Sequence, residues 1–461
     1  MRAIADPGGA LGRGLASIRS EFGIPETFPA AVLAAAQDSS RRAPTEHADR
    51  TGSPFVTLDP ASSTDLDQAF TIDGDGPDLI LRYAIADVAW FVDDGDALDE
   101  EAWRRGTTQY LPDGKAGLYP PLLSEGAASL LPDGPRPAVI FSVRVAADGE
   151  VRLDGAERAI IRSRAKLAYD KVRDGDLPPG FAELARRIRA AEGRRGASRV
   201  NPPAQELAAL GDGRFELLFR PSLVSEVRNA SMSLAANLAI ADLLQAHGTG
   251  LFRIMAEPDE PAVTRLRHMA RGLGLRWPDE ASLPQFERGL DPADPKQARL
   301  MLAIQRAGQG ASYVPFREGE RPWHSAIAST YAHATAPLRR LADRYVVRAA
   351  LAIANGRPVP AAVTDAFEKL PAVMAKADAI GSRIERAAID LAEAVLLEGR
   401  EGEVFEAVAT EVDGRAVRIQ LCDLPVAARL SAEGVSAGDR LRIRLVEADP
   451  ESRTVRFEAG D

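Results

Sequence analysis

The sequence contains little of what a disulfide-bonded or zinc-dependent protein requires. Its 461 residues include a single cysteine, Cys422, and five scattered histidines, with no Cys-x-x-Cys pair. One cysteine excludes an intramolecular disulfide and is consistent with a reducing cytoplasm. Because Cys422 lies in an alternating apolar pattern, we expect a buried structural thiol. The scarcity of cysteine and histidine also argues against a zinc site, since these residues are its usual ligands.

Long apolar runs and an excess of positive charge are also absent. No stretch approaches the roughly 20 apolar residues that cross a bilayer, and the N-terminus lacks a signal-peptide core. We therefore expect a cytoplasmic protein without a membrane partner. The net charge of −10 leaves nucleic-acid binding open, because such binding depends on where the arginines are placed.

An acidic run between Thr57 and Phe70 is present, and it contains Asp59, Asp65 and Asp67. Asp65 and Asp67 are two residues apart, so an extended backbone points both to the same face. A Pro-Ala-Ser-Ser bend can fold Asp59 back beside them. Such carboxylates repel by about 4 kcal/mol per pair at roughly 4 Å and an effective dielectric of about 20. A divalent cation would relieve this repulsion, and oxygen ligands favour Mg²⁺ or Mn²⁺ over zinc. The alternative is a polar turn with a solvated acidic face.

The first fifty residues predict a separate helical unit. Ala10–Phe22 and Pro29–Gln37 have apolar positions at helical spacing and are separated by a short Gly-Ile-Pro-Glu-Thr turn. Two short helices about a tight turn resemble a helix-turn-helix. We therefore divide the chain into a helical unit at 1–50, a central domain at 51–400 and a terminal domain at 401–461.

The central domain is predicted to be α+β, with a sheet followed by helices that pack on it. The predicted strands are Ala69–Ile72, Leu79–Ala86, Ala138–Val145 and Glu157–Ile161. A glycine-rich turn at 73–77 is expected to join the first two. From about residue 184 helical spacing dominates, with predicted helices at Pro221–His247, Glu260–Gly272, Pro295–Gly308 and Pro371–Leu397.

The terminal domain is predicted to be a small β-barrel of the OB type. Its five short strands are expected at 405–412, 416–421, 426–430, 440–446 and 454–457. In the fourth strand arginines alternate with leucine and isoleucine, so Arg440, Arg442 and Arg444 would form a basic outer stripe. This stripe either follows a nucleic-acid backbone or is an ordinary solvated strand face.

A second chemistry-bearing segment runs from Tyr331 to Leu341. Thr335–Pro337 is typical of a helix start with proline in the first turn, and Arg339 and Arg340 follow immediately. A helix N-terminus flanked by two arginines suits a phosphate group. The alternative on this segment alone is a capped helix with exposed arginines.

Together these segments resemble one family. The acidic run is similar to the signature of the RNB catalytic domain of the ribonuclease II and ribonuclease R exoribonucleases. Further matches follow in the family's order: Ala84–Val88, Tyr110–Pro112 with Leu118–Pro120, Lys166–Asp170 and Tyr331–Arg340. The terminal barrel resembles the family's S1 domain. The resemblance covers about residues 51–461 and implies an α+β RNB domain, a mixed sheet covered by helices, followed by an S1-type OB barrel.

The resemblance also implies roles for the residues of the acidic run and of the arginine segment. Asp59, Asp65 and Asp67 would hold one or two Mg²⁺ ions, with Mn²⁺ as the alternative ion. Gln68 would supply a further oxygen ligand. Arg339 would clamp the scissile phosphate and offset charge that develops in the transition state.

For RNA binding, the resemblance implies that Tyr110 stacks on a base near the 3′ end. Its alternative is a half-buried core tyrosine. Tyr169 is a second stacking candidate that could instead serve packing. Arg340 would add positive charge beside the phosphate. Glu385 matches a glutamate that the family places near its active site, and an exposed helix charge is the alternative.

The chain departs from the family pattern at four places. Gln68 replaces a fourth aspartate and loses one negative charge, so one metal ion should bind more weakly. Ala230 and Ser231 stand where many members carry two glutamates, and Asn201–Leu207 has no aromatic to pair with Tyr110. There is no room before residue 51 for the tandem cold-shock barrels typical of the family, so we expect the RNA path to be lined differently.

The sequence therefore predicts a hydrolytic 3′→5′ exoribonuclease that releases nucleoside 5′-monophosphates from single-stranded RNA with a free 3′ end. We expect it to need Mg²⁺ but no nucleotide cofactor and to act as a monomer. Two alternatives stay open. One is an RNA-binding relative that has lost catalysis, which Gln68 and the missing glutamates favour. The other is a metal phosphohydrolase acting on small phosphate esters, against which the barrel argues.

Overall fold

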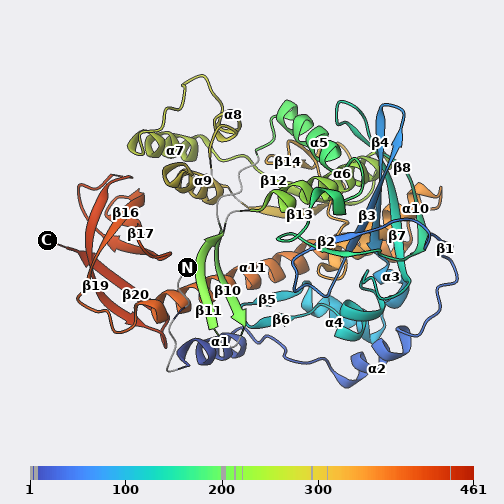
Figure 1. Cartoon of the computed structure of the whole chain (residues 1–461), viewed down its shortest axis with the longest axis horizontal. Helices are drawn as coiled ribbons and strands as arrows, with labels where there is room; N and C mark the ends of the chain where they lie inside the picture. The colour runs from blue at the N-terminus through green and yellow to red at the C-terminus, as the bar shows by residue number, and fades with distance from the viewer. Residues whose placement is uncertain are drawn as a thin grey trace.

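The computed structural model describes residues 4, 9–198, 204–211, 214–220, 222–291, 294–308, 310–436 and 438–460. Figure 1 shows a body of sheet and helices at one end and a barrel at the other, with helix α11 (Ala361–Leu397) running between them. With 37 residues, α11 is about 55 Å long. No helix in the described ranges is long and apolar enough to cross a membrane.

The body is built on a mixed five-stranded sheet. Its strands lie in the order β1 (Ala48–Asp49), β8 (Val151–Ile161), β7 (Arg136–Val145), β4 (Asp78–Ala86) and β3 (Gln68–Asp75). Neighbours are antiparallel except β1, which pairs with β8 in parallel. The four predicted strands are confirmed. The turn predicted over 73–77 is wrong in extent, because β3 pairs with β4 as far as Asp75 and leaves only Gly76 and Pro77 to turn.

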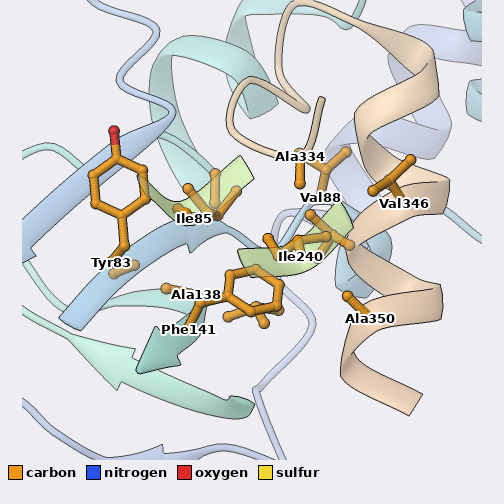
Figure 2. Packing of buried hydrophobic residues seen from close by; sticks show 14 of the residues in the cluster. Tyr83, Ile85, Val88, Ala138, Phe141, Ile240, Ala334, Val346 and Ala350 are labelled. Carbon is orange, nitrogen blue, oxygen red and sulfur yellow. The ribbon is translucent and has the colours of Figure 1, made fainter. Parts of the chain in front are cut away.

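Helices α5 (Phe181–Arg195), α6 (Val224–Ala246) and α10 (Leu341–Ala354) pack on this sheet. Figure 2 shows part of the core, in which Tyr83 and Phe141 come from the sheet. Ile240 comes from α6 and Val346 from α10. All four are completely buried. This shared core fixes the late helix α10 against the early strands, and so brings distant parts of the chain to one place.

The predicted helices are largely confirmed. Besides α6, the structure contains α7 (Glu260–Gly272), the short α8 (Leu283–Glu287) and α9 (Pro295–Ala307). Helix α11 begins at Ala361, ten residues before the predicted start, and Pro371 lies inside it. Val363, Phe367 and Leu370 are buried at helical spacing, so packing stabilises the extra turns ahead of the proline.

Strands that the sequence analysis did not name lie between the predicted helices. β10 (Ala204–Gly211) and β11 (Arg214–Arg220) form an antiparallel hairpin. A four-stranded sheet has the order β13 (Ala311–Pro315), β12 (Leu251–Met255), β14 (Trp323–His324) and β15 (Ser329–Thr330). Helices do dominate from about residue 184, as expected, but these short strands form through pairing between segments that local spacing does not describe. In the segment Asn201–Leu207, residues 201–203 lie outside the described residues.

Short elements surround the acidic run. They are β2 (Thr57–Asp59), α3 (Val88–Phe91), α4 (Ala97–Arg105), β5 (Gln109–Leu111), β6 (Gly114–Ala116) and β9 (Lys166–Ala168). β2 pairs in parallel with β9, and β5 pairs with β6 as a hairpin.

The two N-terminal helices form as predicted, as α1 (Ala10–Glu21) and α2 (Ala30–Ser39). They dock on different parts of the body. α1 packs along α11, where Leu15 shares a core with Leu391, whereas α2 packs on α4. The helix-turn-helix role of this unit stays a prediction.

The terminal barrel is confirmed. Its strands are β16 (Val404–Asp413), β17 (Ala416–Leu421), β18 (Ala427–Ser431), β19 (Arg440–Asp449) and β20 (Thr454–Ala459). They pair in the order β18-β17-β16-β19-β20, and β18 also contacts β20, so the sheet nearly closes on itself. Cys422 follows the last residue of β17 and is exposed. The prediction of a buried thiol was wrong, because Leu421 takes the inward position and the alternation turns Cys422 outward.

Candidate active site

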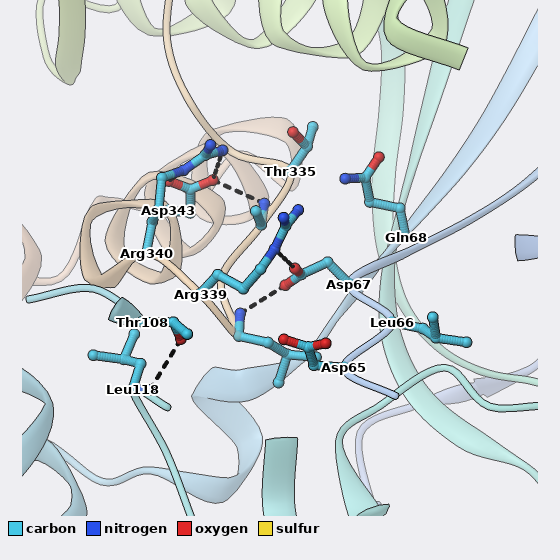
Figure 3. Close-up of polar contacts among 12 residues, drawn as sticks. Asp65, Leu66, Asp67, Gln68, Thr108, Leu118, Thr335, Arg339, Arg340 and Asp343 are labelled. Carbon is cyan, nitrogen blue, oxygen red and sulfur yellow. Dashed lines mark hydrogen bonds and ion pairs between the residues drawn. The ribbon is translucent and has the colours of Figure 1, made fainter. Parts of the chain in front are cut away.

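The acidic run forms the loop between β2 and β3, and Leu66 anchors it. Leu66 is fully buried. Its backbone N–H donates to the Ser129 hydroxyl at 2.9 Å, and that hydroxyl donates to the Thr64 carbonyl at 2.7 Å. With Leu66 held inward, Asp65 and Asp67 lie on the same side of the loop (Figure 3), as the sequence predicted.

Asp67 is joined to the arginine segment. Its Oδ1 accepts from the Leu338 N–H at 2.7 Å, and its Oδ2 accepts from Arg339 Nε at 2.7 Å. Asp67 is almost completely buried, whereas the Arg339 side chain is 38% exposed. Burial raises the pKa of Asp67 to about 6, although Arg339 opposes that rise. The structure therefore brings the two predicted segments together as one charged pair.

The arginine segment differs from its prediction. α10 begins at Leu341, so Thr335–Pro337 lies in a turn ahead of the helix. Asp343 stabilises this turn, because its carboxylate accepts from the Ala336 N–H at 2.8 Å and pairs with Arg340 at 2.7 Å. The predicted helix start at Thr335–Pro337 was wrong, because these residues precede the helix in a turn that Asp343, a residue of the helix, stabilises. Figure 3 shows Arg340 on Asp343 and Arg339 on Asp67.

Tyr110 lies on the β5–β6 hairpin beside Asp65. Its side chain is one of the exposed large hydrophobic groups, at 53% exposure, so the alternative of a half-buried core tyrosine does not apply. The hydroxyl donates to Asp65 Oδ2 at 3.4 Å. Gln109 supports the hairpin by donating to the Ala377 carbonyl of α11 at 3.1 Å. An exposed ring on a supported hairpin can stack on a base.

Lys115 is a site residue that the sequence analysis missed. It pairs with Tyr110 across the hairpin, and its Nζ lies 3.0 Å from Asp65 Oδ1. The Pro-Asp-Gly turn between them was a usable signal, since a tight hairpin places the residues on either side of it opposite each other.

Asp59 closes the site from β2. Burial raises its pKa to about 7, and the carboxylates of Asp67 and Asp65 add to the rise, while Arg339 opposes it. Within the described residues its carboxylate has no hydrogen bond or ion pair. Tyr169 lies next to it, with its N–H donating to the Asp59 carbonyl at 3.2 Å and its hydroxyl accepting from Asn229 Nδ2 at 2.9 Å. The Tyr169 side chain is half-buried and held by these contacts.

Gln68 begins β3, and the hydroxyl of buried Tyr83 donates to its carbonyl oxygen. Figure 3 shows its amide apart from the Asp67–Arg339 pair. The oxygen predicted to ligate a metal is therefore already used within the protein.

The donor set fits a hard divalent cation, although it is not preassembled. Among the described residues, no three acidic, histidine or cysteine side chains converge to hold an ion. Asp65 and Asp67 are each engaged by a cationic side chain. The crowded carboxylates nevertheless raise the pKa of Asp59, and a bound cation would relieve that crowding. Asp59, Asp65 and Asp67 would be its ligands.

The other predicted RNA-binding residues lie farther along α11 and on the barrel. Glu385 is exposed one helical turn beyond Gly381, which faces Gln109 of the Tyr110 hairpin. Arg440, Arg442 and Arg444 are all exposed on β19, as the alternation predicted. Arg442 lies 3.8 Å from Glu406 and Arg444 lies 3.9 Å from Glu458, so two of the three arginines have acidic neighbours.

Comparison with protein families matches residues 48–355 to the RNB domain and residues 403–460 to the RNase II-type exonuclease C-terminal S1 domain. Ribonuclease R of Aquifex aeolicus is 24% identical over 95% of this chain and 69% of the relative. Exoribonuclease 2 of Cronobacter sakazakii is 28% identical over 81% of this chain and 61% of the relative. Ribonuclease R of Thermotoga maritima matches over 54% of its own length, so the chain spans only part of these relatives.

Solved structures share the whole fold. Mycoplasma genitalium RNase R in complex with ribose-methylated single-stranded RNA matches with a TM-score of 0.85 and 19% identity, covering 100% of this chain and 79% of the other. Yeast Ssd1, described as a pseudonuclease, matches with a TM-score of 0.69 and 14% identity, covering 99% of this chain and 59% of the other. At these identities the likeness shows a common fold.

Proposed function

This chain belongs to the RNB-domain family, and on that premise we propose that it is a Mg²⁺-dependent, hydrolytic 3′→5′ exoribonuclease. Its substrate would be single-stranded RNA with a free 3′ end, and its products nucleoside 5′-monophosphates. The observation that carries the proposal is the Asp67–Arg339 pair, which lies beside Asp65 and the exposed Tyr110 ring. Carboxylates, a guanidinium and a stacking surface together suit a phosphodiester that carries a base.

The protein's own residues supply binding and orientation. Arg339 is anchored to Asp67 through Nε and lies against the Tyr110 hydroxyl, so its guanidinium can clamp a phosphate in a fixed geometry. Tyr110 would hold the base of a nucleotide near the 3′ end in register. The divalent cation, when held by Asp59, Asp65 and Asp67, would activate water and stabilise the leaving 3′-oxygen.

The competing function is RNA binding without catalysis. It is favoured by Gln68, whose neutral amide replaces a carboxylate, and by the likeness to a structure described as a pseudonuclease. We prefer the active enzyme because three carboxylates and Arg339 remain around one site. Nothing specific in the site favours a phosphohydrolase of small esters. A monomeric state and a cytoplasmic location stay predictions from the sequence.

Digestion of a 5′-labelled oligoribonucleotide tests the proposal. With Mg²⁺, the label should pass through a ladder of products shortened one nucleotide at a time from the 3′ end. An Asp67→Asn variant should bind the same RNA but cleave it far more slowly. RNA binding with no Mg²⁺-dependent shortening by the wild type would instead establish the inactive relative. Cleavage by the variant at the wild-type rate would remove Asp67 from the site.

A further inference from the structure

Lys115 lies at the site but belongs to neither the acidic run nor the arginine segment. It lies on β6, directly across the hairpin from Tyr110. Its Nζ is 3.0 Å from Asp65 Oδ1 and 3.1 Å from Glu125 Oε1, and its side chain is 25% exposed. Asp65 is only 10% exposed, so this pair is more enclosed than a typical surface salt bridge.

The two oxygens of Asp65 are both occupied from the same hairpin. Lys115 takes Oδ1, and the Tyr110 hydroxyl lies 3.4 Å from Oδ2. The β5–β6 hairpin therefore contacts the Asp65 carboxylate through two donors, the charged ammonium group of Lys115 and the neutral hydroxyl of Tyr110. An ammonium group at about 3 Å from a carboxylate oxygen occupies the space in which a divalent cation would coordinate that oxygen.

The charges of the groups in contact at the site can be summed. Asp59, Asp65 and Asp67 carry −3 when ionised, and Glu125 beside Lys115 adds −1. The side chains of Lys115 and Arg339 return +2, and Gln68 adds no charge. The site therefore stands at −2 before any metal ion arrives, so the protein's own cations already balance half of its negative charge.

We propose that Lys115 is an internal counter-ion. Its ammonium group occupies the place of a divalent cation on Asp65 and moves away when the cation binds. Glu125 is the second carboxylate beside Nζ, and it retains the ammonium group after Asp65 is taken. Because the Tyr110 hydroxyl contacts the same carboxylate, metal binding also releases the β5–β6 hairpin from Asp65. The inference rests on the proposed function, which supplies the reason for a cation at this site.

The other lysine near the acidic run does not have this arrangement. Lys166 donates to the Ala61 carbonyl at 2.9 Å, and no ion pair joins it to an acidic side chain among the described residues. The charge of Lys166 acts on Asp59 without an ion pair, so Lys115 is the lysine that directly contacts a site carboxylate.

Mn²⁺ binding to the full chain without RNA, followed by electron paramagnetic resonance, tests the inference independently of cleavage. Lys115→Met should tighten Mn²⁺ binding by about tenfold, equivalent to about 1.4 kcal/mol. Lys115→Arg keeps the charge and should bind Mn²⁺ like the wild type. Lys369→Met, an exposed lysine of α11, makes the same charge change away from the site and should have no effect. Thermal melts confirm that each variant is folded.

A second background separates local competition from long-range charge. In Asp65→Asn, Lys115→Met should no longer tighten Mn²⁺ binding, because the contested carboxylate is gone. Equal tightening in both backgrounds would overturn the inference, as would unchanged or weaker binding in Lys115→Met. If the wild type failed to shorten RNA, the proposed function would fall while these metal affinities would still decide the role of Lys115.

Discussion

Arg339 Nε donates to Asp67 Oδ2 at 2.7 Å across 272 residues of sequence. This contact joins the loop after β2 to the turn before α10, and the shared core beneath them keeps both in place. Asp67 is buried and the Arg339 side chain is partly exposed, so the arginine is fixed through Nε while part of its guanidinium faces solvent. Such a group is oriented before a phosphate arrives, which is what makes charge stabilisation effective.

The orientation of Arg339 should matter more than its charge alone. Arg339→Lys keeps one positive charge but loses the planar fork, so we expect single-turnover cleavage to fall by about 10²–10³-fold, the usual effect of removing one oriented donor. Arg340→Lys is the matched control, because Arg340 faces Asp343. Equal loss in both variants would mean that the turn, and not the clamp, had been damaged.

The ring of Tyr110 should matter more than its hydroxyl. Tyr110→Ala should weaken binding at the 3′ end by about 1–3 kcal/mol, raising KM and lengthening the shortest product. Tyr110→Phe keeps the ring and loses the hydroxyl, which contacts Asp65 at 3.4 Å and also interacts with Arg339, so its product lengths should match the wild type. Product ladders at single-nucleotide resolution make the comparison, and a phenylalanine variant as impaired as alanine would argue against stacking.

Asp343 should be required for the stability of the arginine turn. Its fully buried carboxylate pairs with Arg340 and accepts from the Ala336 N–H. Asp343→Ala leaves both groups unpaired, so we expect a loss of about 3–5 kcal/mol in the free energy of unfolding by urea. Glu368→Ala breaks the exposed pair with Arg317 and should cost no more than about 1 kcal/mol. Similar losses would contradict the structural role of Asp343.

Stability should depend on pH through Glu393, where α11 meets the barrel. Its Oε1 accepts from Gln205 Nε2 and the Ala427 N–H, and burial raises its pKa to about 7. The unfolded chain loses this proton near pH 4.5, so the folded protein binds more protons between about pH 4.5 and 7. Stability should therefore fall as pH rises through that window, by about 3 kcal/mol at most.

Glu393→Gln tests that dependence, because glutamine still offers an oxygen to both donors but does not ionise. Thermal melts from pH 4.5 to 8 should show a smaller decline for this variant and a higher melting temperature than the wild type above pH 7. Parallel curves for the two proteins would show that Glu393 does not titrate in this window.

Local pattern predicted much of this molecule. The alternation in β19 placed its arginines outward, and the two-residue spacing of Asp65 and Asp67 placed both carboxylates on one side. The predicted start of α11 at Pro371 was wrong, although the buried positions Val363 and Phe367 have the helical spacing that indicates the earlier start.

The predictions that failed depend on side-chain contacts between separate elements. The helix predicted from Thr335 begins six residues later, at Leu341, and Asp343 within it holds the Ala336 N–H in the preceding turn. Lys115 gains its role only through hairpin register and a carboxylate fifty positions earlier. Gln68 was expected to face a metal, but its oxygen accepts from Tyr83 on the neighbouring strand. Spacing in the sequence identifies residues that lie on the same helix or strand, whereas these contacts depend on how helices, strands and turns pack against one another.

The Gln68→Asp variant tests whether the missing fourth carboxylate affects the Mg²⁺ requirement for cleavage. Aspartate adds a negative charge at the position that follows Asp67 in the chain, so we expect a lower Mg²⁺ concentration for half-maximal cleavage. Gln68→Glu controls for charge with a longer side chain. An unchanged Mg²⁺ requirement in the aspartate variant would mean that the three existing carboxylates suffice.

The most direct test of the central claim is digestion of single-stranded RNA in H₂¹⁸O with Mg²⁺, followed by mass spectrometry of the released mononucleotides. Hydrolysis at the Asp67–Arg339 site predicts nucleoside 5′-monophosphates that each carry one ¹⁸O in the phosphate, released far more slowly by Asp67→Asn. Cyclic phosphates, 3′-phosphates or the absence of mononucleotides from the wild type would contradict the account.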